Sequence, residues 1–486
     1  MAEPLDPMMA LAPGLTVVEA SAGTGKTHAI SSLAVRALAE GAITTAGLGV
    51  VTFTEAATAE LKGRLRQRIQ SAESALRRGA TDTSDELVTA LAVGTPTQVD
   101  ARVRRLAQAL TDVDSMTVST IHGFCQRILS ASGALAATVD DSVTDIDEVV
   151  NDRLLALGGA APASVGGLRD AVERRLAMPD SSLWHHPETA EIASFVDACV
   201  ETIETTRQRW RRRTFDSMIT DTRDLLQSID RGPALIAELR DRFGLVMIVE
   251  FQDTDSVQWD IFRIAFLEGA PIPVVVVGDP KQSIYRFRGA ELSAYLDARA
   301  YASRTGGAVR SLSTNWRSDP AMLTAIEMML SGEEFGAADV LFEPVEAADR
   351  PDRAVLVDGR TAPVELRPVP GGTVTEAEPI VLDDLAAEVL RLLDTGRLTD
   401  PSGEHPVRPS DIGIITKSNP DAAKVAEALR AVGVPVVTST RDSVMSSSAA
   451  FQWRTLLESI DRPNATHAAR AVALGHFGSQ IGRAHV

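Results

Sequence analysis

Short apolar runs alternate with longer segments in which apolar residues recur every three or four positions, first over residues 1–120 and again after about residue 240. This alternation predicts strands separated by amphipathic helices, the pattern of an α/β fold with a parallel sheet. The later runs are continuous and rich in valine and isoleucine, as expected for strands covered on both faces. The predicted strands are 15–18, 48–53, 116–120, 245–249 and 273–277.

The same pattern divides the chain. Residues 1–120 and 214–305 carry the alternation of strands and helices, whereas 121–213 shows helical periodicity without a strong strand and is predicted to be a helical insertion. The segment 331–410 is rich in proline, glycine and acidic residues, which predicts irregular connections and short antiparallel strands. Further strands are expected at 411–416 and 435–438.

Composition limits the class of protein. A chain of 486 residues, 44% of them hydrophobic, has the length of roughly three domains with sizeable cores. It has no apolar run long enough to span a membrane, no basic segment typical of a signal peptide, and two cysteines. We therefore expect a protein of the reduced cytoplasm. The net charge of −18 does not exclude nucleic acid, because a local basic groove can bind phosphates within an acidic protein.

A phosphate-binding loop is the strongest chemical signal. It lies between the first predicted strand and a helix, where backbone N–H groups and the helix N-terminus can face an anion. Lys26 supplies a positive charge, and the Thr27 hydroxyl can reach Mg²⁺. Ala20 replaces the first glycine of the usual pattern; the alternative is a structural glycine turn. The loop residues are Ala20, Ser21, Ala22, Gly23, Thr24, Gly25, Lys26 and Thr27.

Acidic residues follow the predicted strand 245–249. A nucleotide hydrolase needs a carboxylate at such a strand end, beside the phosphate loop, to orient and deprotonate the attacking water. Glu250 can be that base, and Asp253 is a second acid three residues later. The alternative is a pair of acids in a surface turn.

Two further segments combine polar, aromatic and basic residues. The segment 278–289 contains Gln282, whose amide could sense a terminal phosphate, and Tyr285, Phe287 and Arg288, which could stack on bases or meet phosphates. The segment 314–318 contains Trp316, which offers a face for adenine, and Arg317, which could reach a γ-phosphate. The alternative for these aromatic residues is packing in the core. His122, taken alone, would be a structural residue.

Taken together, these motifs resemble those of the UvrD-type superfamily 1 DNA helicases, and within them the beta subunits of exodeoxyribonuclease V, the RecB-type helicase–nucleases. The similarity covers nearly the whole chain. The sequences that carry it are EASAGTGKT (19–27), VTFTEAATAEL (51–61), TIHGFCQRIL (120–129), EFQDTD (250–255), GDPKQSIYRFRGA (278–290) and TNWRS (314–318).

The resemblance implies a motor of two RecA-like α/β domains that bind ATP between them and single-stranded DNA across their top. The first domain would comprise 1–120 and 214–305, with 121–213 as an insertion and 306–480 as part of the second domain. Lys26 and Thr27 would bind phosphate and Mg²⁺, Glu250 would be the catalytic base, Gln282 and Arg317 would contact the γ-phosphate, and Trp316 would stack on adenine. The residues implied to face DNA are Phe53, Thr54, His122, Tyr285, Phe287 and Arg288.

The resemblance also implies a biological setting. The parent protein would move 3′ to 5′ on single-stranded DNA, act at duplex ends in double-strand-break repair and recombination, and assemble with gamma-type and alpha-type exodeoxyribonuclease V subunits. No membrane association is expected. A small-molecule kinase would leave the segments 278–290 and 314–318 without a function.

The chain departs from the family pattern in four ways. Val249 stands where the family has the aspartate that holds Mg²⁺, no glutamine precedes the phosphate loop, and the insertion is short. The later helicase motifs and a nuclease domain are also missing, so we expect a truncated chain, with an artefactual tail at 481–486. If Val249 is genuine, the alternative is a hydrolysis-deficient subunit that binds ATP and DNA as a scaffold.

Overall fold

The computed structural model divides the chain into two compact units, Met1–Asp349 and Arg350–Val486, and each is described by itself. The expected tail at 481–486 lies outside the described residues. The structure describes residues 3–9, 11–79, 85–132, 138–139, 146–156, 164–177, 190–210, 212–213, 215–284, 292–350, 354–360, 362–369, 372–438, 448–461 and 470–473.

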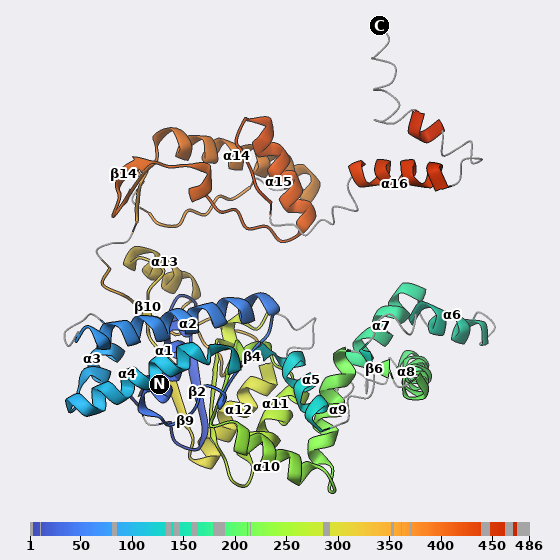
Figure 1. Cartoon of the computed structure of the whole chain (residues 1–486). Coiled ribbons are helices and arrows are strands. Elements are labelled where there is room, and N and C mark those ends of the chain that lie inside the picture. Colours follow the sequence, from blue (N-terminus) through green and yellow to red (C-terminus); the bar gives the residue numbers. More distant parts are fainter. Residues whose placement is uncertain are drawn as a thin grey trace. The chain divides into compact units, whose positions relative to one another are not determined.

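A seven-stranded parallel sheet forms the centre of the first unit (Figure 1). Its strand order is β1-β9-β2-β8-β7-β3-β4. All five strands predicted over 15–277 are present, so the predicted α/β fold with a parallel sheet is confirmed. The strands are β1 (Glu3–Pro4), β2 (Gly14–Ala20), β3 (Leu48–Thr52), β4 (Thr117–Thr120), β7 (Leu245–Val249), β8 (Pro273–Gly278) and β9 (Ala308–Leu312).

The boundary expected at residue 305 differs from the observed one. β9 pairs with β2 from Thr16↔Ala308 to Ala20↔Leu312, so the first unit continues past residue 305. The sequence of β9, Ala-Val-Arg-Ser-Leu, is short, two of its five residues are polar, and all five are half-buried. It therefore lacks the continuous apolar run that identified the other strands.

Both faces of the sheet are covered, because alternate residues of each central strand enter different cores. On β7, Val246 and Ile248 join one core and Leu245 and Met247 the other. Helices α1 (Lys26–Glu40) and α2 (Glu55–Arg77) supply the second core. The first core receives α5 (Ile121–Ala131), α9 (Phe215–Gln227), α10 (Gly232–Arg242), α11 (Ser256–Phe262) and α12 (Leu292–Thr305).

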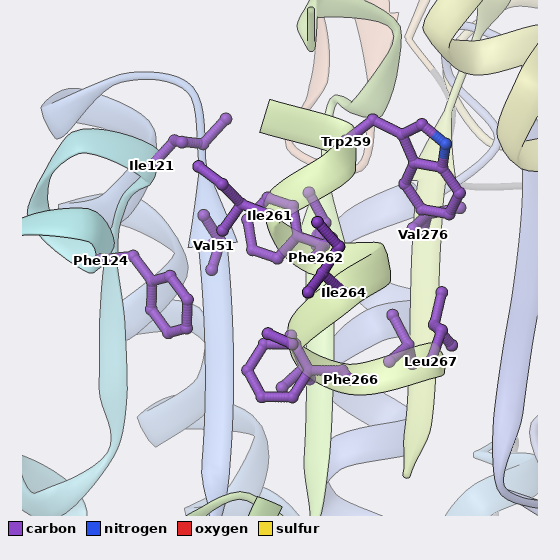
Figure 2. Packing of buried hydrophobic residues seen from close by; sticks show 14 of the residues in the cluster. Val51, Ile121, Phe124, Trp259, Ile261, Phe262, Ile264, Phe266, Leu267 and Val276 are labelled. Carbon is purple, nitrogen blue, oxygen red and sulfur yellow. The ribbon is translucent and has the colours of Figure 1, made fainter. Parts of the chain in front are cut away.

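Aromatic side chains fill the first core (Figure 2). Phe124 of α5 stacks on Phe262 of α11 with ring centroids 5.8 Å apart, and it also contacts Phe266 at 6.1 Å. Phe266 lies in a π-helical turn, η5 (Arg263–Leu267), that continues α11. Because α5 is part of this core, the helical insertion begins after it rather than at residue 121.

Smaller helical groups complete the first unit. Helices α3 (Glu86–Ala92) and α4 (Pro96–Thr111) pack with α1 and α2 around a third apolar cluster. The predicted insertion contains α6 (Ile146–Ala156), α7 (Val165–Ala177) and α8 (Ala190–Trp210), which share a separate core that includes Val150, Val172 and Cys199. The short strand β5 (Thr138–Val139) precedes α6 in the chain and pairs in parallel with β6 (Arg212–Arg213), which follows α8.

Short turns and strands connect the longer elements of the first unit. Among the described residues of the first unit, the 3-10 turns are η1 (Val113–Ser115), η4 (Phe251–Asp253) and η6 (Pro280–Gln282). Near its end, β10 (Thr314–Asn315) pairs in parallel with β11 (Glu346–Ala347), and α13 (Pro320–Leu330) lies between them in the chain.

In its described residues, the second unit contains an antiparallel sheet in the order β12-β13-β14, the helices α14, α15 and α16, and a further helical turn at 470–473. The strands expected at 411–416 and 435–438 are not formed there, so that prediction is wrong. A strand needs a partner for its backbone groups, and none of the described residues pairs with these segments. The elements are β12 (Val355–Val357), β13 (Arg397–Asp400), β14 (Gly403–Pro406), η8 (Pro409–Asp411), α14 (Val374–Thr395), α15 (Asn419–Ala431) and α16 (Ser448–Asp461).

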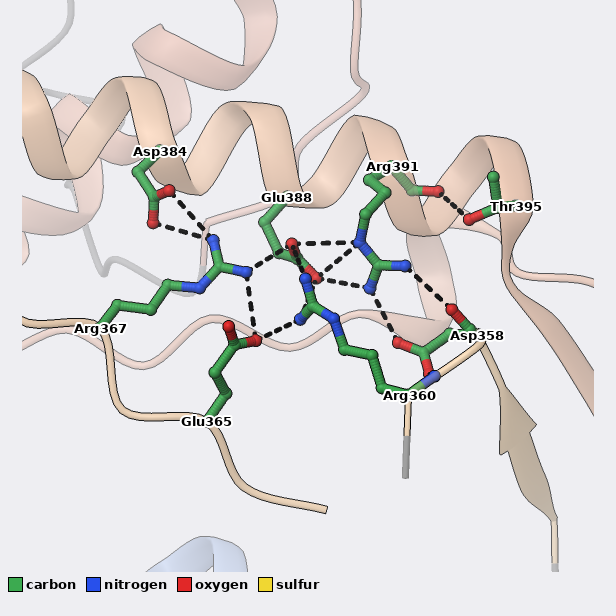
Figure 3. A network of polar contacts seen from close by, with 8 residues as sticks. All are labelled: Asp358, Arg360, Glu365, Arg367, Asp384, Glu388, Arg391 and Thr395. Carbon is green, nitrogen blue, oxygen red and sulfur yellow. Dashed lines mark hydrogen bonds and ion pairs between the residues drawn. The ribbon is translucent and has the colours of Figure 1, made fainter. Parts of the chain in front are cut away.

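A network of arginines and carboxylates ties the segment after β12 to α14 (Figure 3). Glu388 of α14 is its centre. Its carboxylate accepts hydrogen bonds from Arg391 and Arg367 at 2.7 Å each and from Arg360 at 3.0 Å. The side chain of Glu388 is only 19% exposed, so these contacts are better shielded than ordinary surface pairs. They hold the pKa of Glu388 down at about 2, with the Arg391 hydrogen bond as the largest cause.

Replacing Glu388 should therefore weaken the second unit in a pH-dependent way. A carboxylate with a lowered pKa contributes stability above its ordinary value of 4.5, and that stability is lost as pH falls toward 2. We expect Glu388→Gln to lower the thermal unfolding midpoint of the full chain near neutral pH, and the difference from wild type to shrink at acid pH. Circular dichroism measures both.

Glu378→Gln is the matched control, because Glu378 lies on the same helix and makes one ion pair among the described residues, with Lys424 at 2.7 Å. An equal effect of the two substitutions at neutral pH would contradict the central role of Glu388.

Candidate functional site

The described candidate residues follow the carboxyl ends of the parallel strands, where ligands bind in open α/β sheets. The phosphate loop follows β2, Glu250 follows β7, and Gln282 lies in the turn after β8. Phe53 follows β3, and His122 follows β4. Parallel pairing of these strands brings segments from distant parts of the sequence to one edge of the sheet.

The phosphate loop has the backbone that an anion site requires. Gly25 caps α1 in the left-handed region, with φ of 85°, and Gly23 has φ of 79°. Such angles favour glycine. Thr24 is buried, and its hydroxyl donates to the carbonyl of Ser21 at 2.7 Å, which closes the loop on itself. The first turn of α1 thus presents its N-terminus, with Lys26 and Thr27, at the strand edge.

Lys26 is the meeting point of three motifs. Its Nζ lies 3.1 Å from Oε2 of Glu250 and donates to Oε1 of Gln282 at 3.4 Å. Its side chain is only 11% exposed. The structure therefore brings together Lys26, Glu250 and Gln282, which the sequence analysis selected from three separate segments.

The backbone at Glu250 is unusual. With φ of 56°, Glu250 is the only residue other than glycine with a positive φ in the described part of the chain. This conformation costs free energy and persists where the surrounding structure enforces it, most often at functional sites. Here it turns the chain out of β7 into the η4 turn, so that the Glu250 carboxylate reaches Lys26.

Two residues of this site were not singled out from the sequence. Gln252 is 3% exposed; its Nε2 donates to Glu250 at 2.9 Å, and its Oε1 accepts from the backbone N–H of Asp279 at 3.0 Å. Asp279 in turn accepts from Nε2 of Gln282 at 2.7 Å. A closed ring of hydrogen bonds thus joins Lys26, Glu250, Gln252, Asp279 and Gln282. Gln252 lies in the motif 250–255 and Asp279 in the motif 278–290, but no sequence signal distinguished them from packing residues.

Trp316 and Arg317 lie against the phosphate loop. The backbone N–H of Trp316 donates to the carbonyl of Gly23 at 2.8 Å. Its indole lies beside Gly25, since a Cβ built there would be 3.5 Å from Trp316 Cδ1. Half of Trp316 is exposed, and Arg317 is also exposed, so both side chains face outward from a fixed backbone.

The protein donors for Mg²⁺ are few. Mg²⁺ prefers oxygen ligands and is usually held by one or two carboxylates together with phosphates. The Thr27 hydroxyl can supply one oxygen, but Val249 supplies none and packs against the core under α1. Across the described residues, no three His, Cys, Asp or Glu side chains form a metal-binding group. The donor set therefore does not fit an ion held by the protein through the end of β7.

Asp253 is the remaining acid of the site. It is 6% exposed, and its Oδ1 is buried without a hydrogen-bond partner. Burial is the main cause that raises the pKa of Asp253 to about 7; the Glu250 carboxylate adds to the rise, and Lys26 opposes it. The raised pKa favours the protonated form of Asp253, which limits the repulsion between two neighbouring acids.

The candidates for DNA contact fall into two groups. Thr54 caps α2 by accepting from Ala57 N at 3.1 Å, and the next residue, Glu55, accepts from the Thr120 hydroxyl at 3.1 Å. This bond joins the turns that carry Phe53 and His122, so the two turns lie side by side at the sheet edge. The candidates Tyr285, Phe287 and Arg288 lie outside the described residues.

Comparison with known proteins agrees with the geometry. A family model described as "UvrD/REP helicase N-terminal domain" matches residues 6–302. The protein named RecBCD enzyme subunit RecB from Mycolicibacterium smegmatis is 34% identical over 493 residues, which cover 95% of this chain and 43% of that protein. The one from Mycobacterium tuberculosis is 34% identical with the same coverages. The one from Escherichia coli is 28% identical, covering 97% of this chain and 52% of that protein.

These matches bear out the resemblance inferred from the motifs and the RecA-like α/β fold of the first unit. The chain spans about half or less of the length of these relatives. Within the described residues, no helix has the length and apolarity needed to cross a bilayer.

The environment of Asp253 generates a prediction about stability. Its pKa rises from an ordinary 3.8 to about 7, so the folded protein keeps a proton that the unfolded chain has lost. Its contribution to stability is therefore fully present below 3.8 and is lost as pH rises through about 7. We expect Asp253→Asn to become progressively more stable than wild type over this range, as measured by urea unfolding midpoints.

Asp230→Asn serves as the comparison, because Asp230 is an exposed aspartate of the same unit. A stability difference between wild type and Asp253→Asn that stays constant with pH would contradict the raised pKa of Asp253.

Proposed function

The chain belongs to the UvrD/REP helicase family, and on that premise we propose that it is an ATP-dependent DNA helicase or translocase subunit of a RecBCD-type complex. The observation that carries the proposal is the convergence of Lys26, Glu250 and Gln282 beside the phosphate loop. A structural glycine turn does not require a cation, a base and an amide at one point. In this proposal, ATP hydrolysis drives movement 3′ to 5′ along single-stranded DNA.

Each residue has a separate task in the proposed reaction. The loop N–H groups and Lys26 bind the β- and γ-phosphates, and the Glu250 carboxylate orients the attacking water and accepts its proton. Gln282 and Arg317 contact the γ-phosphate, so its departure changes their contacts. Mg²⁺ bound with ATP would take oxygen ligands from the phosphates and from Thr27, and we assign it no step.

The remaining candidate residues would contact the adenine base and the DNA. Trp316 stacks on adenine from its fixed position beside Gly25. Single-stranded DNA crosses the turns that carry Phe53, Thr54 and His122, with Tyr285, Phe287 and Arg288 as further contacts. We also propose that the protein acts at duplex DNA ends, in the cytoplasm, in double-strand-break repair and recombination. Its partners would be gamma-type and alpha-type subunits, as the name RecBCD of its relatives suggests.

The first test concerns Lys26. Removing its charge leaves the phosphates and Glu250 without their shared cation, so Lys26→Ala is expected to lower DNA-stimulated ATP hydrolysis by about 10²-fold or more. Phosphate release with and without single-stranded DNA measures the rate. Lys417→Ala, which removes an exposed lysine of the second unit, is the control. Substantial hydrolysis by Lys26→Ala would refute the assignment of the site.

The second test concerns Val249, which favours a competing function. Without a carboxylate at the end of β7, the chain could bind ATP and DNA as a hydrolysis-deficient scaffold. We expect Val249→Asp to raise the rate of ATP hydrolysis by about 10- to 100-fold, because an added metal ligand stabilises charge in the transition state. Nucleotide affinity should change less than the rate.

Val249→Asn separates charge from polarity, because asparagine places a neutral oxygen at the same point. Equal and substantial rates for wild type and Val249→Asp would refute the claim that Val249 limits hydrolysis. A slow wild type that binds both ATP and DNA would favour the scaffold.

A further inference from the structure

Asn315 joins two segments that lie 293 positions apart in the sequence. It ends β10 and is 4% exposed. Its Nδ2 donates to the carbonyl of Ala22 in the phosphate loop at 2.9 Å. Its Oδ1 accepts from the backbone N–H groups of Arg317 and Ser318 at 2.8 Å each. One buried amide therefore holds both the loop and the segment that presents Arg317.

The loop is held at a second point as well. The carbonyl of Gly23, next to that of Ala22, accepts from Trp316 N at 2.8 Å. Two successive carbonyls of the loop are thus bonded to residues 315 and 316. With these carbonyls engaged on one side, the loop is kept in the conformation in which its N–H groups can face an anion.

Gly23 shows how closely the two segments approach. A Cβ built at Gly23 would lie 2.8 Å from Asn315 Nδ2 and 2.9 Å from Arg317 Cβ. Gly25, with a similar φ, has no such neighbour closer than 3.5 Å. A side chain larger than glycine at position 23 would therefore push the loop away from Asn315.

Asn315 is itself anchored independently of the loop. It pairs with Ala347 of β11, and its carbonyl accepts from Ala348 N at 2.8 Å. Its backbone is therefore held by the β10–β11 pair, while its side chain bonds the loop.

We propose that Asn315 is a positioning residue that locks the phosphate loop to the Trp316–Arg317 segment, so that the contacts to the base and to the phosphates of a nucleoside di- or triphosphate are preassembled within the first unit. The inference rests on the proposed function and deepens it. Preassembly raises affinity because the loop and the segment need not be ordered when the nucleotide binds.

The test is the affinity for ADP and for ATPγS, measured by isothermal titration calorimetry on the full chain. Asn315→Asp keeps the shape and the acceptor for the Arg317 and Ser318 amides but replaces the donor to Ala22 with a second oxygen. We expect about tenfold weaker binding of both nucleotides, and an unchanged preference between them. Asn315→Ala also loses the acceptor, so it is expected to lose part of the preference for ATPγS that depends on Arg317.

Asn419→Asp, an exposed asparagine in the second unit, controls for the change of charge. Thermal unfolding without nucleotide reports the folded state, and if the alanine variant folds poorly the aspartate variant decides. Wild-type affinity for ADP in Asn315→Asp would overturn the inference while leaving the proposed function intact. A wild-type chain that binds neither nucleotide would overturn the proposed function, and this inference with it.

Discussion

The ammonium of Lys26 is the interaction on which the site depends. It lies within 3.4 Å of acceptors from two different strand ends, and its own position is set by the first turn of α1. A half-buried cation that must be paired constrains everything around it, because leaving it without partners would cost several kcal/mol. The strained backbone at Glu250 and the turn at Gln282 each bring an acceptor to this cation.

Amide side chains organise the rest of the site. Gln252 and Asn315 are both buried and both use their nitrogen as a donor and their oxygen as an acceptor. An amide can satisfy a carboxylate or carbonyl on one side and a backbone N–H on the other without adding charge. Glycines provide the space: a Cβ at Gly278 would lie 2.8 Å from Gln252 Oε1, as a Cβ at Gly23 would lie from Asn315. The neutral amides of Gln252 and Asn315 thus connect the motifs to one another.

The two units are stabilised differently. The first has continuous apolar cores on both faces of a parallel sheet, built from alternate residues of the same strands. The second has a small apolar cluster between α14 and α15, and its arginine–carboxylate network anchors the irregular segment after β12. Ile415 and Val437 are almost fully exposed, and none of the described residues pairs with their strand-like segments. Apolar periodicity predicts a strand only when partners are present to pair with it.

The sequence by itself determined the α/β class, five of the seven strands of the parallel sheet, the phosphate loop and the family, because local periodicity and contiguous motifs carry that information. It also identified Lys26, Glu250, Gln282, Trp316 and Arg317 as candidates, and their roles remain predictions, as do those of the DNA-facing residues. Only the tertiary structure decided that β9 joins the sheet, that β10 belongs to the first unit, and that Gln252, Asp279 and Asn315 connect the motifs. Those roles depend on hydrogen bonds between residues as many as 293 positions apart, and such pairings leave no periodic trace in the chain.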